Sequence, residues 1–309
     1  MMRSFFFGGL LALSACYCQA GVITLEQNEE GVTVKVDGKP FTNYLIKAGP
    51  KPYLWPVVGP NGVEMTRAYP MKEVDGEKKD HPHHRSFWFT HGNVNGVDFW
   101  AETKGHGDIK HKEFLKVNSG PPATLTTVNE WIGPDGKKHL EDTRTLTFSA
   151  NDKSRTIDFD ITLQATNGEV VFNDTKEGSF GLRIPTVMDV TSKQGGKILN
   201  SEGQTDAEAW GKPAKWVDYT GTLNDKPVGI AILNHPSSFR YPTHWHVRTY
   251  GLFAANPFGL KDFKTGQDGA HTLKEGDSIS LRYRVIFHLG NTEDAQLQKS
   301  FEQYSAEKK

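Results

Sequence analysis

The sequence predicts an all-β fold, a large antiparallel two-sheet β-sandwich with one helix at its C-terminal end. The first observation is alternation with a period of two: Ile157, Phe159, Ile161 and Leu163 alternate with polar residues, and residues 279–287 repeat the pattern. The second is turn chemistry, since 31 Gly and 16 Pro separate the short runs. The third is length, because ten or more antiparallel strands within residues 21–309 favour two packed sheets over a small barrel.

Shorter runs rich in Val, Ile, Thr and aromatic residues predict further strands. These runs are Val32–Val36, Phe41–Ile46, Thr124–Trp131, Thr143–Phe148, Val228–Leu233 and Trp245–Phe253. Gly133-Pro134-Asp135-Gly136 predicts a hairpin turn, because Pro presets φ and Gly accepts a positive φ. Near the end of the chain, Thr292 is expected to cap a helix that runs to Tyr304 and packs on the outside. No repeat or linker marks a boundary, so residues 21–309 are expected to form one domain.

Residues 1–20 have the pattern of an export signal, with Arg3 before a short apolar core and small residues. Two cleavage sites compete. Leu13-Ser14-Ala15-Cys16 has the pattern of a bacterial lipoprotein site, which would put a lipid anchor on Cys16, whereas Cys18-Gln19-Ala20 suits ordinary cleavage. We therefore expect an exported protein that is periplasmic, anchored to the outer membrane or secreted. Both cysteines lie in this segment, so the domain has no disulfide framework.

Composition and motifs exclude several classes of function. Lys+Arg (36) and Asp+Glu (37) leave a formal net charge of −1, so no basic field draws the protein to nucleic acid. Beyond the N-terminus no apolar run approaches the roughly 18 to 20 residues of a membrane helix. The sequence has no nucleophile elbow, no P-loop and no dinucleotide glycine fingerprint. These absences leave histidine, carboxylate and arginine chemistry without a predicted cofactor.

Histidines are concentrated in the run Asp80-His81-Pro82-His83-His84-Arg85-Ser86-Phe87-Trp88-Phe89-Thr90-His91. In an extended strand, His84 and Trp88 would share one face and Arg85 and His91 the other, so adjacent histidines could not point the same way. Because histidine titrates near neutral pH, His84 and His91 are candidate acids or bases. Arg85 and Trp88 are candidate substrate contacts. The alternative is that some of these histidines only hold the loop around Pro82.

Asp98 precedes two aromatic residues, Phe99 and Trp100. A sugar ring offers hydroxyl groups at its edge and C–H groups on its faces, so an acid beside a stacking surface suits it. Asp98 and Trp100 are therefore candidate substrate contacts. The alternative interpretation is a turn that Asp98 anchors.

A second cluster lies at residues 244–250. On a strand, His244, His246, Arg248 and Tyr250 would line one face. His244 and His246 are candidate acids or bases, and Arg248 and Tyr250 are candidate substrate contacts.

A metal site is the alternative interpretation of the same pair. Two histidines separated by one residue on a strand form a recurrent metal-ligand geometry. A divalent metal at His244 and His246 would need a third ligand from His84, His91 or Glu177.

A third charged stretch surrounds Glu177. Glu177 precedes a turn that contains Gly178 and Gly181, whose spacing indicates a close backbone approach. Glu177 is therefore a candidate base, and Arg183 a candidate contact for an anionic or polyhydroxyl group. The alternative is a surface charge cluster.

With these residues in hand, the chain resembles a family of secreted bacterial proteins of unassigned function, often labelled PmoA-like or "methane oxygenase", over roughly Tyr53 to Gly259. The segments that carry the resemblance are His81–Ser86, Asn95–Trp100, Lys176–Gly178, Ala209–Gly211, Trp216–Tyr219 and Pro242–His246 to Asn256–Gly259. Asn93 departs from the pattern, where an Asp is expected. A methane oxygenase subunit needs membrane helices, which this sequence lacks. The resemblance implies instead a sandwich similar to the galactose mutarotase-like superfamily and a setting among exported carbohydrate-degrading systems.

Three hypotheses remain open. The leading one is an exported carbohydrate-active enzyme, of epimerase, lyase or hydrolase type, that uses His and Glu as acid and base on a sugar or oxidised glycoside. The second is a carbohydrate-binding or capture lipoprotein that changes nothing. The third is a metal enzyme ligated by histidine.

Overall fold

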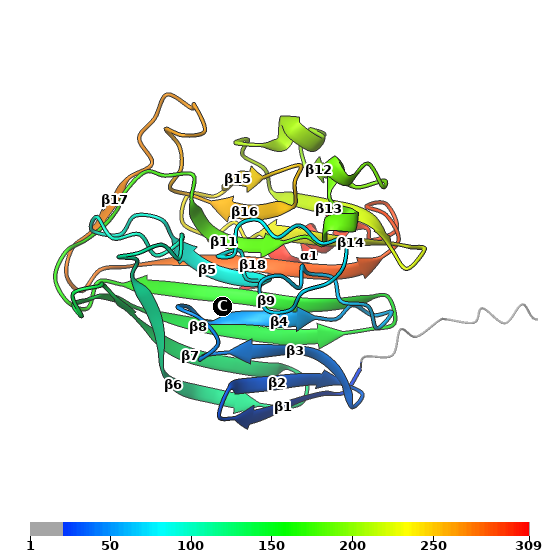
Figure 1. Cartoon of the computed structure of the whole chain (residues 1–309), viewed down its shortest axis with the longest axis horizontal. Helices are drawn as coiled ribbons and strands as arrows, with labels where there is room; N and C mark the ends of the chain where they lie inside the picture. The colour runs from blue at the N-terminus through cyan, green and yellow to red at the C-terminus, as the bar shows by residue number, and fades with distance from the viewer. Residues whose placement is uncertain (1–20, 309) are drawn as a thin grey trace, which may run out of the picture.

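Two eight-stranded antiparallel sheets face each other in the computed structural model, which describes residues 21–308 (Figure 1). The predicted export signal and the lipid anchor at Cys16 lie outside the described residues. The first sheet has the order β1 (Ile23–Asn28), β2 (Gly31–Val36), β3 (Lys39–Leu45), β4 (Tyr53–Val57), β5 (Phe87–His91), β11 (Gly178–Arg183), β16 (Leu252–Asn256) and β15 (His244–Val247). The second has the order β12 (Lys197–Asn200), β13 (Trp216–Leu223), β14 (Lys226–Asn234), β18 (Ser278–Leu289), β9 (Ser154–Gln164), β8 (Lys138–Ala150), β7 (Ala123–Ile132) and β6 (Asp108–Asn118).

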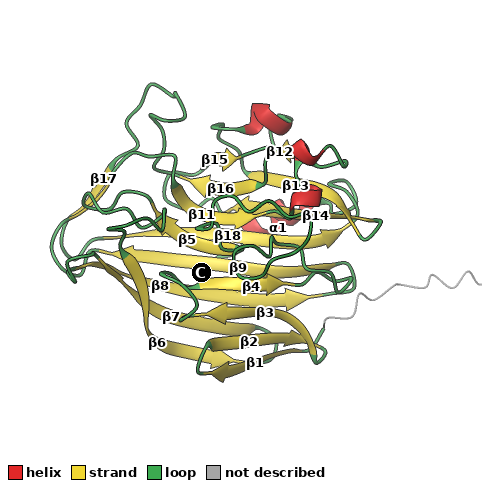
Figure 2. Cartoon of the chain, in the orientation of Figure 1, coloured by secondary structure: helices red, strands yellow, loops and turns green. Residues whose placement is uncertain are grey.

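A few short elements complete the fold (Figure 2). Strands β10 (Val170–Phe172) and β17 (His271–Leu273) form a two-stranded ribbon at one end. The 3-10 helices are η1 (Thr186–Met188), η2 (Val190–Ser192) and η3 (Asp206–Ala209), and the one α-helix described is α1 (Leu297–Ser305).

One aromatic core lies between the sheets. Alternate residues of each strand face inward, so Phe87 and Phe89 of β5 meet Phe159 of β9, and Phe180 of β11 meets Tyr283 of β18. The rings of Phe180 and Tyr283 are stacked with their centroids 4.4 Å apart. Large aromatic side chains bury much apolar area, which stabilises the pairing of the sheets. The prediction of an all-β two-sheet sandwich is confirmed.

Two predicted elements were wrong in detail. The run Trp245–Phe253 forms two strands, because the chain reverses at Arg248–Gly251, where Gly251 has φ +100°. Thr292 does not cap the helix: its hydroxyl donates to Asp218 at 2.7 Å, and α1 begins at Leu297. The helix packs on the outer face of the second sheet, as predicted, through Leu297 and two aromatic residues.

The periodicity did not reveal several strands. Those not predicted from sequence are β1, β4, β6, β10, β11, β12, β13 and β17. The short ones among them lack the length that periodicity needs, and β11 is buried along its whole length, so it shows no alternation of burial.

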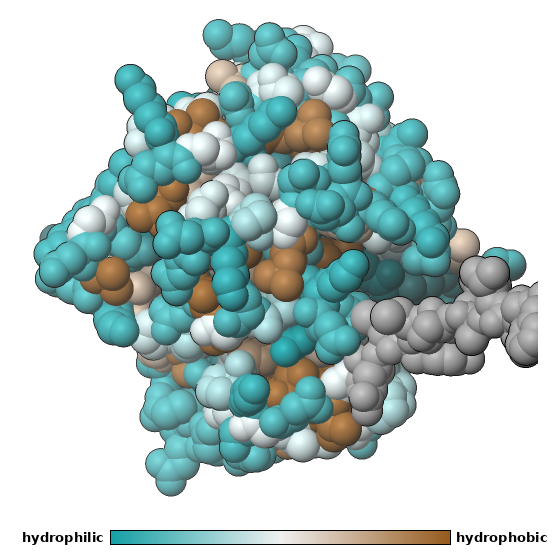
Figure 3. Space-filling model, turned by 90° about the vertical axis from the view of Figure 1, so that its right-hand side faces the viewer, coloured by the Kyte–Doolittle hydropathy of each residue, from teal (hydrophilic) through white to brown (hydrophobic). Residues whose placement is uncertain are grey.

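Among the described residues, none of the helices has the length and apolar character to span a bilayer. On the face drawn in Figure 3, hydrophobic residues lie scattered between hydrophilic ones. The large exposed apolar side chains are single ones such as Val22 and Leu115.

The outer face of the first sheet carries a second, smaller apolar cluster. Tyr53, Trp88, Trp100, Leu252 and Ala254 form it. Because alternate residues of β5 point to opposite faces, Trp88 lies here while its neighbours Phe87 and Phe89 enter the core. This outer face is where the candidate site lies.

Candidate functional site

A cavity of about 470 Å³ lies beside the outer apolar cluster. Four segments far apart in the sequence supply its lining: the loop before β5, the loop after β5, the segment before β11, and β15 with the turn that follows it. The lining residues are His81, His83, His84, Trp100, Ala101, Lys176, Glu177, His246, Arg248 and Tyr250. Six of the twelve predicted site residues therefore meet at one place: His84, Trp100, Glu177, His246, Arg248 and Tyr250.

Strand register produces this convergence. Trp88 of β5 pairs with Gly181 of β11, Gly181 pairs with Ala254 of β16, and Ala254 pairs with His246 of β15. A Cβ on Gly181 would lie 2.8 Å from the Trp88 ring, so glycine is required there for the ring to lie flat across the strand. The close approach predicted from the glycine spacing is confirmed at this position.

Arg183 fixes the tautomer of His84, a buried residue that lines the cavity. Arg183, which can only donate, places Nη1 3.0 Å from Nδ1 of His84. The imidazole therefore accepts through Nδ1 and carries its proton on Nε2, which has no hydrogen-bond partner among the described residues. Burial, then the neighbouring His83 and Arg183, hold the pKa of His84 well below its usual value. His84 is thus a neutral N–H donor at pH 7.

Asp80 fixes the arginine behind His84. Nη2 of Arg183 donates to Oδ1 of Asp80 at 2.8 Å, and Arg67 donates to the same oxygen. Burial would raise the pKa of the Asp80 carboxyl, but the two guanidinium groups outweigh it and lower that pKa to about 2. The predicted contact Arg183 therefore positions His84 and does not itself line the cavity.

His246 has the opposite polarity. Its Nδ1 lies 2.8 Å from the backbone carbonyl oxygen of Lys176, which can only accept, so Nδ1 carries the proton. The lone pair of the neutral ring is then on Nε2. Burial lowers the pKa of His246 to about 4 although the nearby Glu177 raises it. The cavity therefore combines one imidazole fixed as donor with another fixed as acceptor.

Glu177 supplies the carboxylate of the cavity. Its side chain is half-buried and pairs with Nζ of Lys176 at 2.8 Å. Burial and the charge of Lys51 lower the pKa of His83 to about 4, and the negative charge of Glu177 opposes this shift. The backbone is fixed as well, because the Glu177 carbonyl accepts the Gly92 N–H at 2.7 Å. A carboxylate thus lies among neutral imidazoles.

Two other predicted contacts have structural partners instead. Arg85 forms a two-pronged ion pair with Glu102, which is also 2.6 Å from Nζ of Lys51. Asp98 accepts the backbone N–H groups of Trp100 and Ala101, so the alternative interpretation, a turn anchored by Asp98, describes its geometry.

The remaining predicted contacts surround His84 and Arg248. The Trp88 ring lies beneath His84, stacked at 5.3 Å, and does not line the cavity. Trp100 lines the cavity with its ring edge-on to His84 at 5.6 Å. Tyr250 lines it with its ring close to Arg248 and Arg183.

Two candidate acid–base histidines lie away from the cavity. His91 faces the core side of β5, and its Nε2–H donates to the Asn173 carbonyl at 2.8 Å. His244 packs against the ring of Phe263, with the rings parallel and 6.1 Å apart. Among the described residues, no group of three His, Cys, Asp or Glu side chains is placed to hold a metal ion. The predicted pairing of His244 and His246 thus gains no third ligand from this part of the chain.

Four residues that line the cavity were not predicted from the sequence: His81, His83, Ala101 and Lys176. The assumption of an extended chain was wrong at His83 and His84. Both precede β5 in a turn with Ser86 at φ +57°, so both line the cavity with their rings 4.5 Å apart. The density of histidines in this run was the signal that could have indicated His81 and His83.

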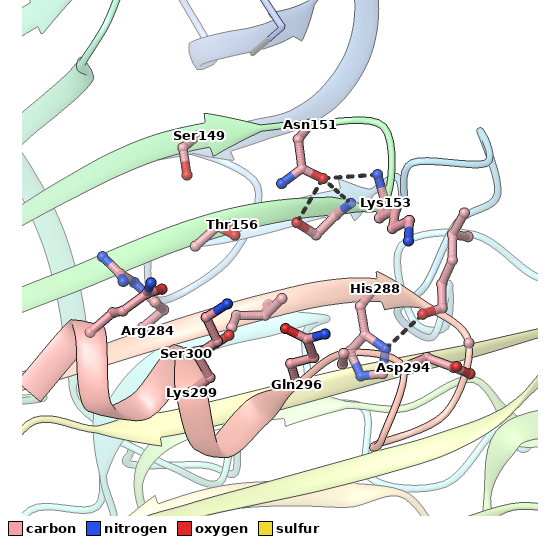
Figure 4. Close-up of a pocket in the computed structure, with 16 residues that line it drawn as sticks. Ser149, Asn151, Lys153, Thr156, Arg284, His288, Asp294, Gln296, Lys299 and Ser300 are labelled. Carbon is pink, nitrogen blue, oxygen red and sulfur yellow. Dashed lines mark hydrogen bonds between the residues drawn. The ribbon is translucent and has the colours of Figure 1, made fainter. Parts of the chain in front are cut away.

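A larger pocket of about 880 Å³ lies elsewhere, between α1 and the outer face of β8, β9 and β18 (Figure 4). Its polar groups are largely paired. Arg284 is bound by Asp158 and Glu307, and His288 by Asp218. Because Arg284 and His288 are occupied by structural partners, we assign this pocket no ligand.

Acid is expected to destabilise the fold through His91. Burial lowers the pKa of His91 to about 4, although the Asn173 carbonyl opposes this. Because the unfolded chain binds this proton near pH 6.5 and the native state does not, stability falls as the pH falls from 7 toward 4. His91 alone should contribute a loss of about 2 kcal/mol between pH 7 and pH 5.

Denaturant unfolding at both pH values measures this loss. Between pH 7 and pH 5, the free energy of unfolding of His91→Gln should fall by about 2 kcal/mol less than that of the wild type. Equal losses in the two proteins would contradict the assignment. The pKa of His91 can also be measured directly in the wild type by following its imidazole NMR signal as the pH changes.

The comparisons with known proteins give a family and a set of distant folds. The family described as "Family of unknown function (DUF6807)" matches residues 31–302. No curated protein matches the sequence. The PmoA-like resemblance is not shown by these matches and stays a prediction.

The similar solved structures are carbohydrate-related proteins at low identity. The GH36 alpha-galactosidase AgaA from Geobacillus stearothermophilus is 13% identical, with a TM-score of 0.43, over 87% of this chain and 40% of that one. This chain therefore spans about two fifths of that enzyme. A variant of AgaA was solved with raffinose and matches with a TM-score of 0.42, 13% identity and coverage of 88% and 41%. A galactose mutarotase-like protein from Lactobacillus casei is 12% identical, with a TM-score of 0.38, over 86% of this chain and 100% of that one. At these values none of the likenesses assigns an activity to this chain.

Proposed function

Since this chain belongs to the DUF6807 family, whose function is unknown, we propose from its own cavity that it is an enzyme that moves protons on a bound carbohydrate. The observation that carries the proposal is the opposite polarity of two neutral histidines in one cavity. His84 carries a proton on Nε2 and His246 a lone pair on Nε2, and Glu177 lines the same cavity. A donor, an acceptor and a carboxylate in one cavity match a sugar, whose hydroxyl groups both donate and accept hydrogen bonds.

The chemistry follows from these polarities. Glu177 or His246 takes a proton from a sugar carbon next to a carbonyl or carboxyl group, and the N–H of His84 stabilises the negative charge that develops on the oxygen of that group. In an epimerisation a proton then returns to the same carbon from its other face, and in an elimination the oxygen substituent on the neighbouring carbon leaves as a C=C bond forms. A neutral imidazole suits the role of His84, because it donates a hydrogen bond without giving up its proton. Trp100 offers an aromatic surface to the C–H groups of the ring.

The carboxylate count favours epimerase or lyase chemistry over hydrolysis. Glycoside hydrolases commonly place two carboxylates on either side of the scissile bond. Glu177 is the one carboxylate among the described residues that line this cavity. Proton abstraction needs only one base and a stabilised oxygen, which the cavity supplies. The predicted export signal would place this activity outside the cytoplasm.

Product analysis by NMR tests the proposal. Purified protein is incubated with free sugars, glycosides, uronates and keto-sugars in D₂O, and the Glu177→Gln variant serves as control. An epimerase or lyase should incorporate deuterium at a ring carbon or form a new alkene signal, and the variant should lose most of this activity. Broadened ligand signals without any product would overturn the enzyme proposal and favour the carbohydrate-capture protein.

A further inference from the structure

We propose that the ligand of this cavity carries a carboxylate, as a uronic acid residue does, and that Arg248 binds it. The inference rests on the proposed function, because it names the substrate class of the same cavity. It starts from Arg248, a half-buried residue on the turn between β15 and β16 that lines the cavity.

The guanidinium of Arg248 is held in place without the use of its N–H groups. It lies 5.6 Å from the centre of the Trp210 ring and 5.4 Å from that of Tyr250. Two aromatic faces restrict its position by cation–π attraction. None of the hydrogen bonds or ion pairs found among residues 21–308 involves its side-chain nitrogens. The planar fork of N–H donors therefore remains free for a ligand.

The other charges near the cavity are already balanced or occupied. Lys176 pairs with Glu177 at 2.8 Å. Arg183 donates to Asp80 and to His84. Of the charged side chains that line the cavity, Arg248 thus remains as an uncompensated positive charge in a chain whose formal net charge is −1.

The chemistry of this site favours a planar monoanion. A guanidinium binds a carboxylate through two parallel N–H donors, a match that a lysine cannot make. A phosphate dianion needs more positive charge than one free guanidinium supplies, and the carboxylate of Glu177 would repel a dianion more strongly than a monoanion. On a carbohydrate, the group that fits is the carboxylate of a uronic acid.

Competition binding tests the inference with oligosaccharides of matched length. Three pools are used: fragments that contain galacturonate, glucuronate or mannuronate; neutral glucan, galactan and xylan fragments; and sulfated fragments. The bound fraction is measured by native mass spectrometry for the wild type, Arg248→Gln, Arg248→Lys and Lys116→Gln, which removes one exposed positive charge far from the cavity lining.

The wild type should prefer the uronate pool. Arg248→Gln should weaken uronate binding about 10- to 100-fold, the range of a hydrogen bond to a charged group, and leave neutral binding unchanged. Arg248→Lys should bind the uronate pool with an affinity between those of the wild type and Arg248→Gln. Lys116→Gln should bind all three pools as the wild type does. Equal binding of neutral fragments, or unchanged uronate binding by Arg248→Gln, would overturn the inference and leave the proposed function standing. A preference for the sulfated pool would overturn the carboxylate assignment. Absence of binding to all three pools would overturn the proposed function as well.

Discussion

Replacing Glu177 by Gln is expected to lower turnover about 10²- to 10⁴-fold, the usual contribution of a general base. The change keeps the size of the side chain and removes its charge and its basicity. Glu177 is placed for this role by two contacts: its backbone carbonyl is fixed by Gly92, and its carboxylate is held by Lys176. The loss should appear in kcat, with KM changed far less, because the carboxylate acts on the proton in transit.

A matched control separates catalysis from folding. Glu275→Gln makes the same chemical change at an exposed turn and should leave turnover unaltered. Thermal unfolding of both variants shows whether the fold is kept. Turnover by Glu177→Gln within about threefold of the wild type would remove Glu177 from the mechanism and leave His246 as the base.

The largest expected effect on stability is at Asp142, in the core. Asp142 of β8 accepts hydrogen bonds from Asn129 at 2.7 Å, from Trp131 at 2.7 Å and from two nitrogens of Arg144 at 2.9 and 2.8 Å. Its side chain is fully buried, and that of Arg144 is 1% exposed. Asp142→Ala should lower the free energy of unfolding by about 3–5 kcal/mol, because it leaves a guanidinium buried without its counter-charge.

A double variant tests that explanation. Asp142→Leu with Arg144→Met removes both charges and should cost clearly less than Asp142→Ala alone, because no ion is left unpaired. Asp152→Ala, on an exposed turn, is the surface control. Urea unfolding of the four proteins measures the differences. If the double variant is destabilised as much as Asp142→Ala, the cost comes from lost packing and from the lost hydrogen bonds of Asn129 and Trp131, and not from the unpaired charge.

The core of the sandwich could be predicted because burial leaves a local signature. In β9, Ile157, Phe159, Ile161 and Leu163 face the core, as their spacing predicted. A strand covered on one face shows period two in its own sequence, so no knowledge of its partner is needed. The break at Gly251 escaped prediction because the alternation continues through the turn.

The sequence alone could not separate residues that line the cavity from those that support it. Arg85 and Arg248 are both arginines within histidine-rich clusters. Only the structure shows that Glu102 pairs with Arg85, whereas Arg248 lies between two aromatic rings that leave its N–H groups free to bind a ligand. Likewise, His91 and His246 follow the same strand pattern, but the face of the sheet decides that one enters the core and the other the cavity.

By itself, the sequence determined the strands whose residues alternate with period two, their inward faces and the residue types of the site, because each depends on neighbours along the chain. The tertiary structure decided which of these residues meet and in which protonation state. His84, Glu177 and His246 come together only through the register of β5, β11, β16 and β15. The donor and acceptor roles of the two histidines come from Arg183 and from the Lys176 carbonyl, and no local pattern encodes partners so distant in the chain.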